Sequence, residues 1–148
     1  MEITLSIIAI VISLISGVFA LYTFIWTAQR DKKQATLDAF NTLQEQALDV
    51  LNEYTGAEIK HIIEEKNKSE YRELSKCLAR LEHFSVGANT GIYDRKTVYE
   101  LAHGFLDVGI WYKLQPVLEA KQKGKTENYY QNYCALVKWM KAQKKDTP

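Results

Sequence analysis

The polar and apolar side chains at the start of the chain follow a single helical register. Between Ile3 and Thr27 there is no charged residue, and the small and hydroxyl side chains recur at alternating spacings of three and four. Such positions share one face of an α-helix, so the pattern predicts a helix with a narrow, weakly polar stripe. The stripe consists of Ser6, Ala9, Ser13, Ser16, Ala20, Thr23 and Thr27. Because a simple anchor gains nothing from this order, we expect the stripe to face other copies of the helix, as a pore lining or a helix interface.

The same segment is long enough to cross a membrane. About 20 apolar residues span a hydrocarbon core of about 30 Å, and this stretch has 25 residues. It contains 14 Leu, Ile, Val and Phe side chains, which favour insertion by roughly 4 to 8 kcal/mol before polar offsets. A cleaved signal peptide is the alternative, but the start at Glu2, the length and the lack of an Ala-x-Ala site favour a retained anchor. We assign residues 1–28 to a transmembrane helix.

Charged residues flank this segment unequally. Arg30, Lys32 and Lys33 follow it, and Glu2 is the one charged side chain before it. Positively charged flanks stay in the cytoplasm, so we expect a single-pass protein with its N-terminus outside. Residues 29–148 are then a cytoplasmic helical domain.

The rest of the chain has helical periodicity and no lasting alternation of period two, which predicts an all-α fold. The first helix is expected to run from Ile3 to about Tyr54, because no Gly or Pro interrupts it. A short amphipathic helix is expected over residues 57–66. Ser69 is expected to cap a third helix that stops at residues 89–91.

Two further helices are expected to complete a small bundle. Asp94 is expected to cap the first of them, and Pro116 to break or restart the chain. Thr126, after Gly124, is expected to cap the last helix. The predicted inward side chains are Val98, Leu101, Phe105 and Val108 in the fourth helix, and Tyr130, Tyr133, Val137 and Met140 in the last.

Few residues point to chemistry. His61, His83 and His103 have no His or Cys three or four residues away, so no metal site is expected. No phosphate-binding loop or catalytic motif indicates a cofactor. Arg80, Glu82 and His83 form a local cluster, which we interpret as a polar network, structural rather than catalytic. The formal charge of +1 gives no overall field for nucleic acid, so no direct nucleic-acid contact is expected.

Residues 81–94 read Leu-Glu-His-Phe-Ser-Val-Gly-Ala-Asn-Thr-Gly-Ile-Tyr-Asp. This motif resembles the signature of a bacterial family of unknown function, whose members have one N-terminal membrane helix and a small helical cytoplasmic domain. The layout is also similar to that of the accessory membrane proteins of type VI-B CRISPR systems. That resemblance implies a ring or pore in the bacterial inner membrane, acting in antiviral defence downstream of an RNA-guided nuclease effector.

Those accessory proteins are discussed as divergent HEPN proteins, helical RNases marked by an Arg, four to six residues and a His. Here two residues separate Arg80 from His83, and seven separate Arg95 from His103. The departure argues against RNase activity, and we expect no enzyme.

Three functions follow from these patterns. The first is a homo-oligomer in the bilayer whose first helices surround an axis; the stripe is packed shut in a small oligomer and lines a wet lumen in a larger ring. The second is a membrane-tethered adaptor or scaffold for a cytosolic partner. The third is a degenerate HEPN-like RNase.

Overall fold

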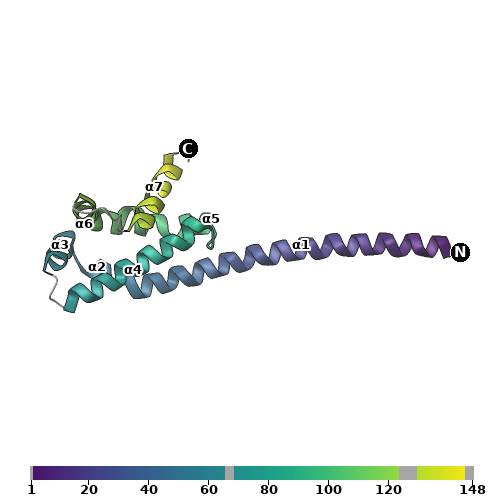
Figure 1. Ribbon diagram of the computed structural model, residues 1–148, viewed down its shortest axis with the longest axis horizontal. Helices are drawn as coiled ribbons and strands as arrows, with labels where there is room; N and C mark the ends of the chain where they lie inside the picture. Colours follow the sequence, from purple (N-terminus) through teal and green to yellow (C-terminus); the bar gives the residue numbers. More distant parts are fainter. Residues whose placement is uncertain (1, 66–68, 124–129, 146–148) are drawn as a thin grey trace.

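The computed structural model describes residues 2–65, 69–123 and 130–145. All regular structure within these residues is helical, which confirms the predicted all-α fold. Figure 1 shows a long rod with a bundle of helices packed around one end of it. In chain order the elements are α1 (Glu2–Leu43), the π-helix η1 (Gln44–Leu48), α2 (Asp49–Glu53), α3 (Gly56–Glu64), α4 (Ser69–Thr90), α5 (Arg95–Ala102), the π-helix η2 (His103–Ile110), α6 (Trp111–Lys123) and α7 (Gln131–Lys145).

The rod is formed by α1, η1 and α2 together. They follow one another without a break from Glu2 to Glu53, roughly 75 Å at 1.5 Å per residue, which confirms the predicted first helix. The rod ends at Tyr54, whose backbone is extended. Thr55 and Glu58 then form a reciprocal capping box that starts α3. The boundary at residue 28 falls inside α1, so the apolar segment and the bundle share one helix.

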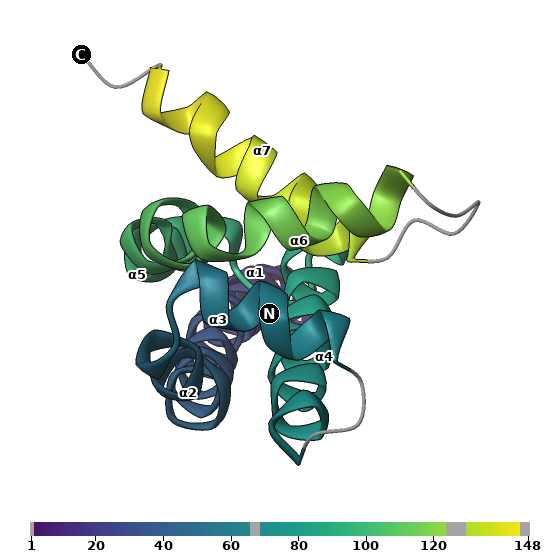
Figure 2. The same cartoon turned by 90° about the vertical axis from the view of Figure 1, so that its left-hand side faces the viewer.

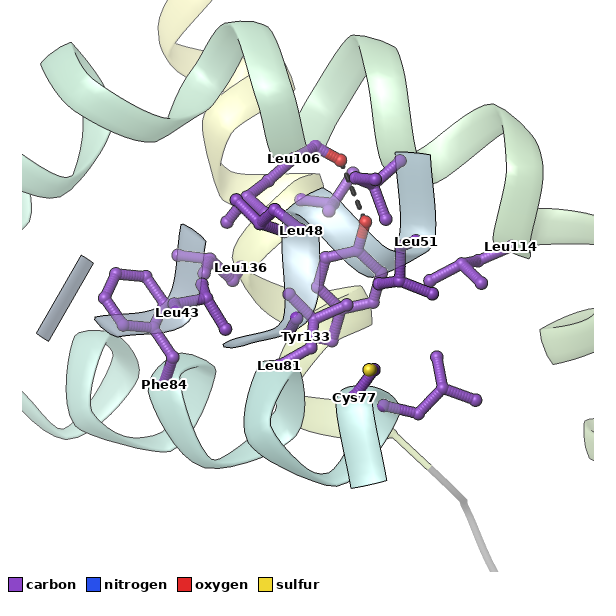
Figure 3. Close-up of a cluster of buried hydrophobic side chains, with 14 of the residues drawn as sticks. Leu43, Leu48, Leu51, Cys77, Leu81, Phe84, Leu106, Leu114, Tyr133 and Leu136 are labelled. Carbon is purple, nitrogen blue, oxygen red and sulfur yellow. Dashed lines mark hydrogen bonds between the residues drawn. The ribbon is translucent and has the colours of Figure 1, made fainter. Parts of the chain in front are cut away.

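The bundle packs its core against the last third of the rod. Figure 2 looks along the rod and shows α2 and α4 side by side, with α6 and α7 lying across from them. Leu48 and Leu51 from the rod meet Leu81 from α4 and Leu136 from α7 in the cluster drawn in Figure 3. All four side chains are buried. The rod, α4 and α7 therefore supply side chains to one common core.

The predicted inward face of the fourth helix is wrong beyond its first turns. Asp94 caps α5 as expected, and Val98 is buried. From His103, however, the chain continues as the π-helix η2, whose turns hold more residues than those of an α-helix. This change of period turns Phe105 and Val108 to the surface, 43% and 47% exposed, and buries Leu106, Asp107 and Ile110 instead.

Pro116 does not break the chain, contrary to the prediction. It lies inside α6, which continues from Trp111 to Lys123. A proline removes the hydrogen bond to the carbonyl four residues earlier, here that of Tyr112. Tyr112 is 69% exposed, so this bond is given up on the solvent side of the helix.

The last helix begins later than predicted. Tyr130 precedes α7 with a positive φ of 58°, and α7 starts at Gln131. Tyr133, Val137 and Met140 are buried as expected. The predicted cap at Thr126 and the break at Gly124 lie outside the described residues.

Candidate functional site

The small-residue stripe lies on a part of α1 that the bundle leaves bare. No part of the apolar window of this helix is buried, and from Ile7 to Trp26 its large apolar side chains are 48% to 71% exposed. Stripe positions up to Thr23 are exposed, and Thr27 is half-buried. The helix lies near the N-terminus and is long and apolar enough to cross a membrane. If these apolar side chains are shielded from water, the shielding must therefore come from lipid or from other chains.

One stripe hydroxyl shows how such a helix tolerates polar groups. The Thr23 hydroxyl donates to the Phe19 carbonyl oxygen at 2.9 Å, within its own helix. A hydroxyl that bonds back in this way needs no water, so it can face lipid, a neighbouring helix or a wet lumen.

The stripe and the bundle occupy opposite faces of the rod. Thr36 lies nine residues beyond Thr27, about two and a half turns, so it points away from the stripe. Gln34 and Glu45, seven and 18 residues beyond Thr27, return close to the stripe's face, and both are exposed. The rod positions that the bundle buries are Thr36, Phe40, Leu43, Ala47, Leu48 and Leu51. The stripe-bearing face is thus uncovered along α1 from Ser6 onward.

Thr36 ties the rod to the turn before α5. Its hydroxyl donates to the Lys32 carbonyl at 2.7 Å and accepts the Asp94 backbone N–H at 2.8 Å. The Asp94 carboxylate in turn accepts the side-chain hydroxyl and the backbone N–H of Thr97, at 2.7 and 2.9 Å. These two bonds lower the pKa of Asp94 from its ordinary value. The contact fixes the bundle to the rod just beyond the apolar segment.

Residues of the 81–94 motif surround the contact between Thr36 and Asp94, and we call this region the junction of rod and bundle. The Tyr93 ring stacks on Phe84, with ring centroids 5.3 Å apart, and lies flat against Gly87. A Cβ on Gly87 would lie 2.3 Å from a Tyr93 ring carbon, so only glycine fits this position. Gly91 ends α4 with a φ of 79°, a left-handed conformation that suits glycine. The motif thus reads as a close-packed corner between the rod, α4 and α5.

The cluster of Arg80, Glu82 and His83 is divided by the structure. Glu82 faces α7: its carboxylate accepts the backbone N–H groups of Asn132 and Tyr133, at 3.0 and 2.9 Å, and so caps the start of that helix. Arg80 faces the rod, where its guanidinium donates to the Gln46 carbonyl at 2.9 Å. His83 is exposed beside Arg80 in an open groove between the rod and α4. These contacts are structural.

The other histidines have ordinary surroundings. His61 pairs with Glu65 across one helical turn at 3.4 Å. His103 bonds the Tyr99 carbonyl at 2.9 Å and stacks on the Tyr99 ring. Arg95 stacks over Trp139 at 4.5 Å. Across the described part of the chain, no three His, Cys, Asp or Glu side chains gather into a metal-binding group.

Sequence reasoning missed two of the residues that hold the junction. The sequence does mark Thr36, because this hydroxyl residue lies at helical spacing from the apolar rod residues that form the core. Asn132 had none: its backbone N–H bonds Glu82, and its carbonyl accepts the Asn89 side chain at 2.8 Å. Both partners lie more than 40 residues away along the chain.

Comparison with known proteins places the chain in a family. Residues 10–140 match the family described as a domain of unknown function (DUF4760). The chain belongs to this family. The matched region includes most of the apolar segment as well as the bundle, so both parts are features of the family's domain. No curated protein and no solved structure matches the chain.

Proposed function

We propose that the protein is a membrane-anchored homo-oligomer, a ring or pore that permeabilises the membrane. Its first helices surround a common axis, with the Ser, Ala and Thr stripe facing inward and the larger apolar side chains facing lipid. Small side chains let membrane helices approach closely, and hydroxyls suit a hydrated wall.

One observation carries this proposal: the stripe is bare along the rod, on the face opposite the bundle. A stripe covered by the bundle would serve intramolecular packing. Because the bundle instead buries Thr36 and Phe40 on the far side, copies can meet along the stripe without their cytoplasmic domains standing between them.

The setting of this oligomer is also a proposal, drawn from the flanking charges and the resemblance to type VI-B CRISPR accessory proteins. The N-terminus lies outside and the bundle in the cytoplasm of a bacterium, at its inner membrane. An RNA-guided nuclease effector is the partner, and antiviral defence is the role.

Two leucines in the stripe test the proposal. Ser13→Leu with Ser16→Leu places bulky side chains where close approach is needed, so we expect loss of the multimer and of dye release from vesicles. Mass photometry of the detergent-purified protein measures the first effect. The matched control is Val11→Leu with Val18→Leu, two exposed residues of the same segment on the face opposite the stripe.

The control pair should leave assembly and dye release within about twofold of the parent. A parent protein that is monomeric in detergent and in native bilayers would end the proposal. Equal effects of the two leucine pairs would show that bulk anywhere in the segment matters, and would remove the role of the stripe.

A membrane-tethered adaptor is the second candidate, favoured by an exposed apolar row. Phe105, Val108 and Tyr112 are 43%, 47% and 69% exposed, at spacings of three and four along η2 and α6. If the protein is an adaptor, replacing residues 1–28 by an unrelated single-pass helix should preserve activity. Loss of activity in that chimaera would exclude the adaptor.

A further inference from the structure

The bare face of the rod continues beyond the membrane segment as an acidic row. Past Thr27 the same face carries Asp31, Asp38, Glu45, Asp49 and Glu53, with the amide side chains of Gln34 and Asn41 between them. All seven side chains are exposed. Within the rod, Asp31 pairs with Arg30 and Asp38 accepts the Gln34 amide. We call these five carboxylates the acidic row.

A basic row lies next to it on α4. Arg72, Lys76 and Arg80 are four residues apart and therefore share one face of that helix. All three are exposed, and they line an open groove together with Gln46 and Val50 of the rod. Glu73 also lines this groove. We call these three residues the basic row.

The two rows run side by side on one surface of the molecule. The rod and α4 lie against each other in both views (Figures 1 and 2), and the Arg80 bond to the Gln46 carbonyl joins them. Asp38 of the acidic row and Arg80 of the basic row line a single groove. This surface therefore has an acidic edge on the rod and a basic edge on α4.

The membrane restricts how two copies can present this surface to each other. Every copy of a single-pass protein inserts in the same direction, so the symmetry axis of an oligomer runs along the membrane normal, roughly parallel to the rod. A rotation about such an axis, with the groove between the rod and α4 turned toward it, brings one edge of the surface against the opposite edge of the neighbour. The acidic edge then meets a basic edge, and like charges do not meet.

We propose that the acidic row of one copy docks on the basic row of the next copy. This inference rests on the proposed homo-oligomer and adds the cytoplasmic surface that joins its protomers. The occupant is a second copy of this chain, because the two edges are complementary in charge and the acidic edge continues the face of the small-residue stripe. Exposed ion pairs contribute little individually and weaken with salt, so the rows set register and neighbour orientation while the membrane helices supply affinity.

Charge reversal tests the docking. Glu45→Lys with Asp49→Lys puts two positive charges opposite the neighbour's basic row, and Arg72→Glu with Lys76→Glu puts two negative charges opposite the neighbour's acidic row. Each protein alone should assemble about tenfold less well at roughly 50 mM salt, since like charges now face each other. Mixed together, or with all four changes in one chain, assembly should return to the parent level. Native mass measurement of full-length protein in detergent gives the readout.

A matched control is Lys138→Glu with Lys144→Glu, two exposed lysines of α7 outside both rows; it should assemble like the parent. Circular dichroism melts identify any reversal that unfolds the bundle, and recovery on mixing is not expected of an unfolded chain. If both reversed proteins assemble like the parent while the Ser13 and Ser16 leucine pair dissociates, the docking is overturned and the ring survives. If the parent protein itself is monomeric, both the docking of the two rows and the proposed homo-oligomer fail.

Discussion

At the scale of single residues, the 81–94 motif is a packing device. Leu81 and Phe84 are buried in the core, Glu82 caps α7, and Gly87 receives the ring of Tyr93. Asp94 caps α5. These packing and capping roles account for the mixture of residue types in the motif.

Gly87→Ala tests this interpretation. A Cβ there would lie 2.3 Å from the Tyr93 ring, so the ring must leave its stack on Phe84, and we expect a loss of about 1–3 kcal/mol in the free energy of unfolding. Chemical denaturation in detergent measures it. Gly104→Ala is the control, because nothing lies within 4 Å of its new methyl group. Equal stability of the two variants would contradict the close-packed corner.

At the scale of elements, the two π-helices are the least regular parts of the fold. Each has a backbone carbonyl that takes a side-chain donor from a neighbouring helix. In η1 the Gln46 carbonyl accepts Arg80, and in η2 the Leu106 carbonyl accepts the Tyr133 hydroxyl at 2.9 Å (Figure 3). Because π-turns are rare and their geometry is poor, these bonds between elements help to stabilise them.

Tyr133→Phe removes one of these donors. Tyr133 is 1% exposed, and burial raises the pKa of its hydroxyl, which therefore stays protonated and donates. We expect the free energy of unfolding to fall by about 1 kcal/mol, as for a lost buried hydrogen bond. Tyr112→Phe makes the same chemical change at a site that is 69% exposed and should be neutral. Thermal melts of the two proteins give the comparison, and identical melts would show that η2 does not need this bond.

At the scale of the whole molecule, the rod couples the orientation of the apolar segment to that of the bundle. It is helical from Glu2 to Glu53, so a rotation of the stripe about the rod axis is also a rotation of the bundle. The Thr36 bond to the Asp94 backbone fixes the bundle's angle on the rod. In the proposed oligomer, the stripe and the charged rows can both contact neighbouring copies only if their relative angle is kept.

Insertions between Ala28 and Gln29 test this coupling. Two added alanines turn the stripe by about 200° against the bundle, whereas seven added helical residues turn it by only about 20° and lengthen the rod by roughly 10 Å. We expect the two-residue insertion to lose the discrete multimer and the seven-residue insertion to keep it, as measured by mass photometry. Normal assembly with both insertions would mean that the two regions act independently.

The sequence alone was sufficient for every feature that depends on neighbours along one helix. The apolar segment, its stripe, the long rod and the cap at Asp94 arise from side chains three and four residues apart, so local spacing predicts them. The stripe from Ser6 to Thr23 is exposed, and that it faces other copies of the helix stays a prediction.

Tertiary structure decided what depends on partners distant in sequence. The π-turns of η2, the continuation of α6 through Pro116 and the division of Arg80, Glu82 and His83 among different neighbours had no reliable local signal. A helix changes its period, or keeps a proline, when packing against other elements offsets the local cost, and that packing exists only once the bundle has formed. The angle between stripe and bundle depends on both local sequence and tertiary packing. The helical period sets where each residue points, and the packed core decides which face of the rod stays uncovered.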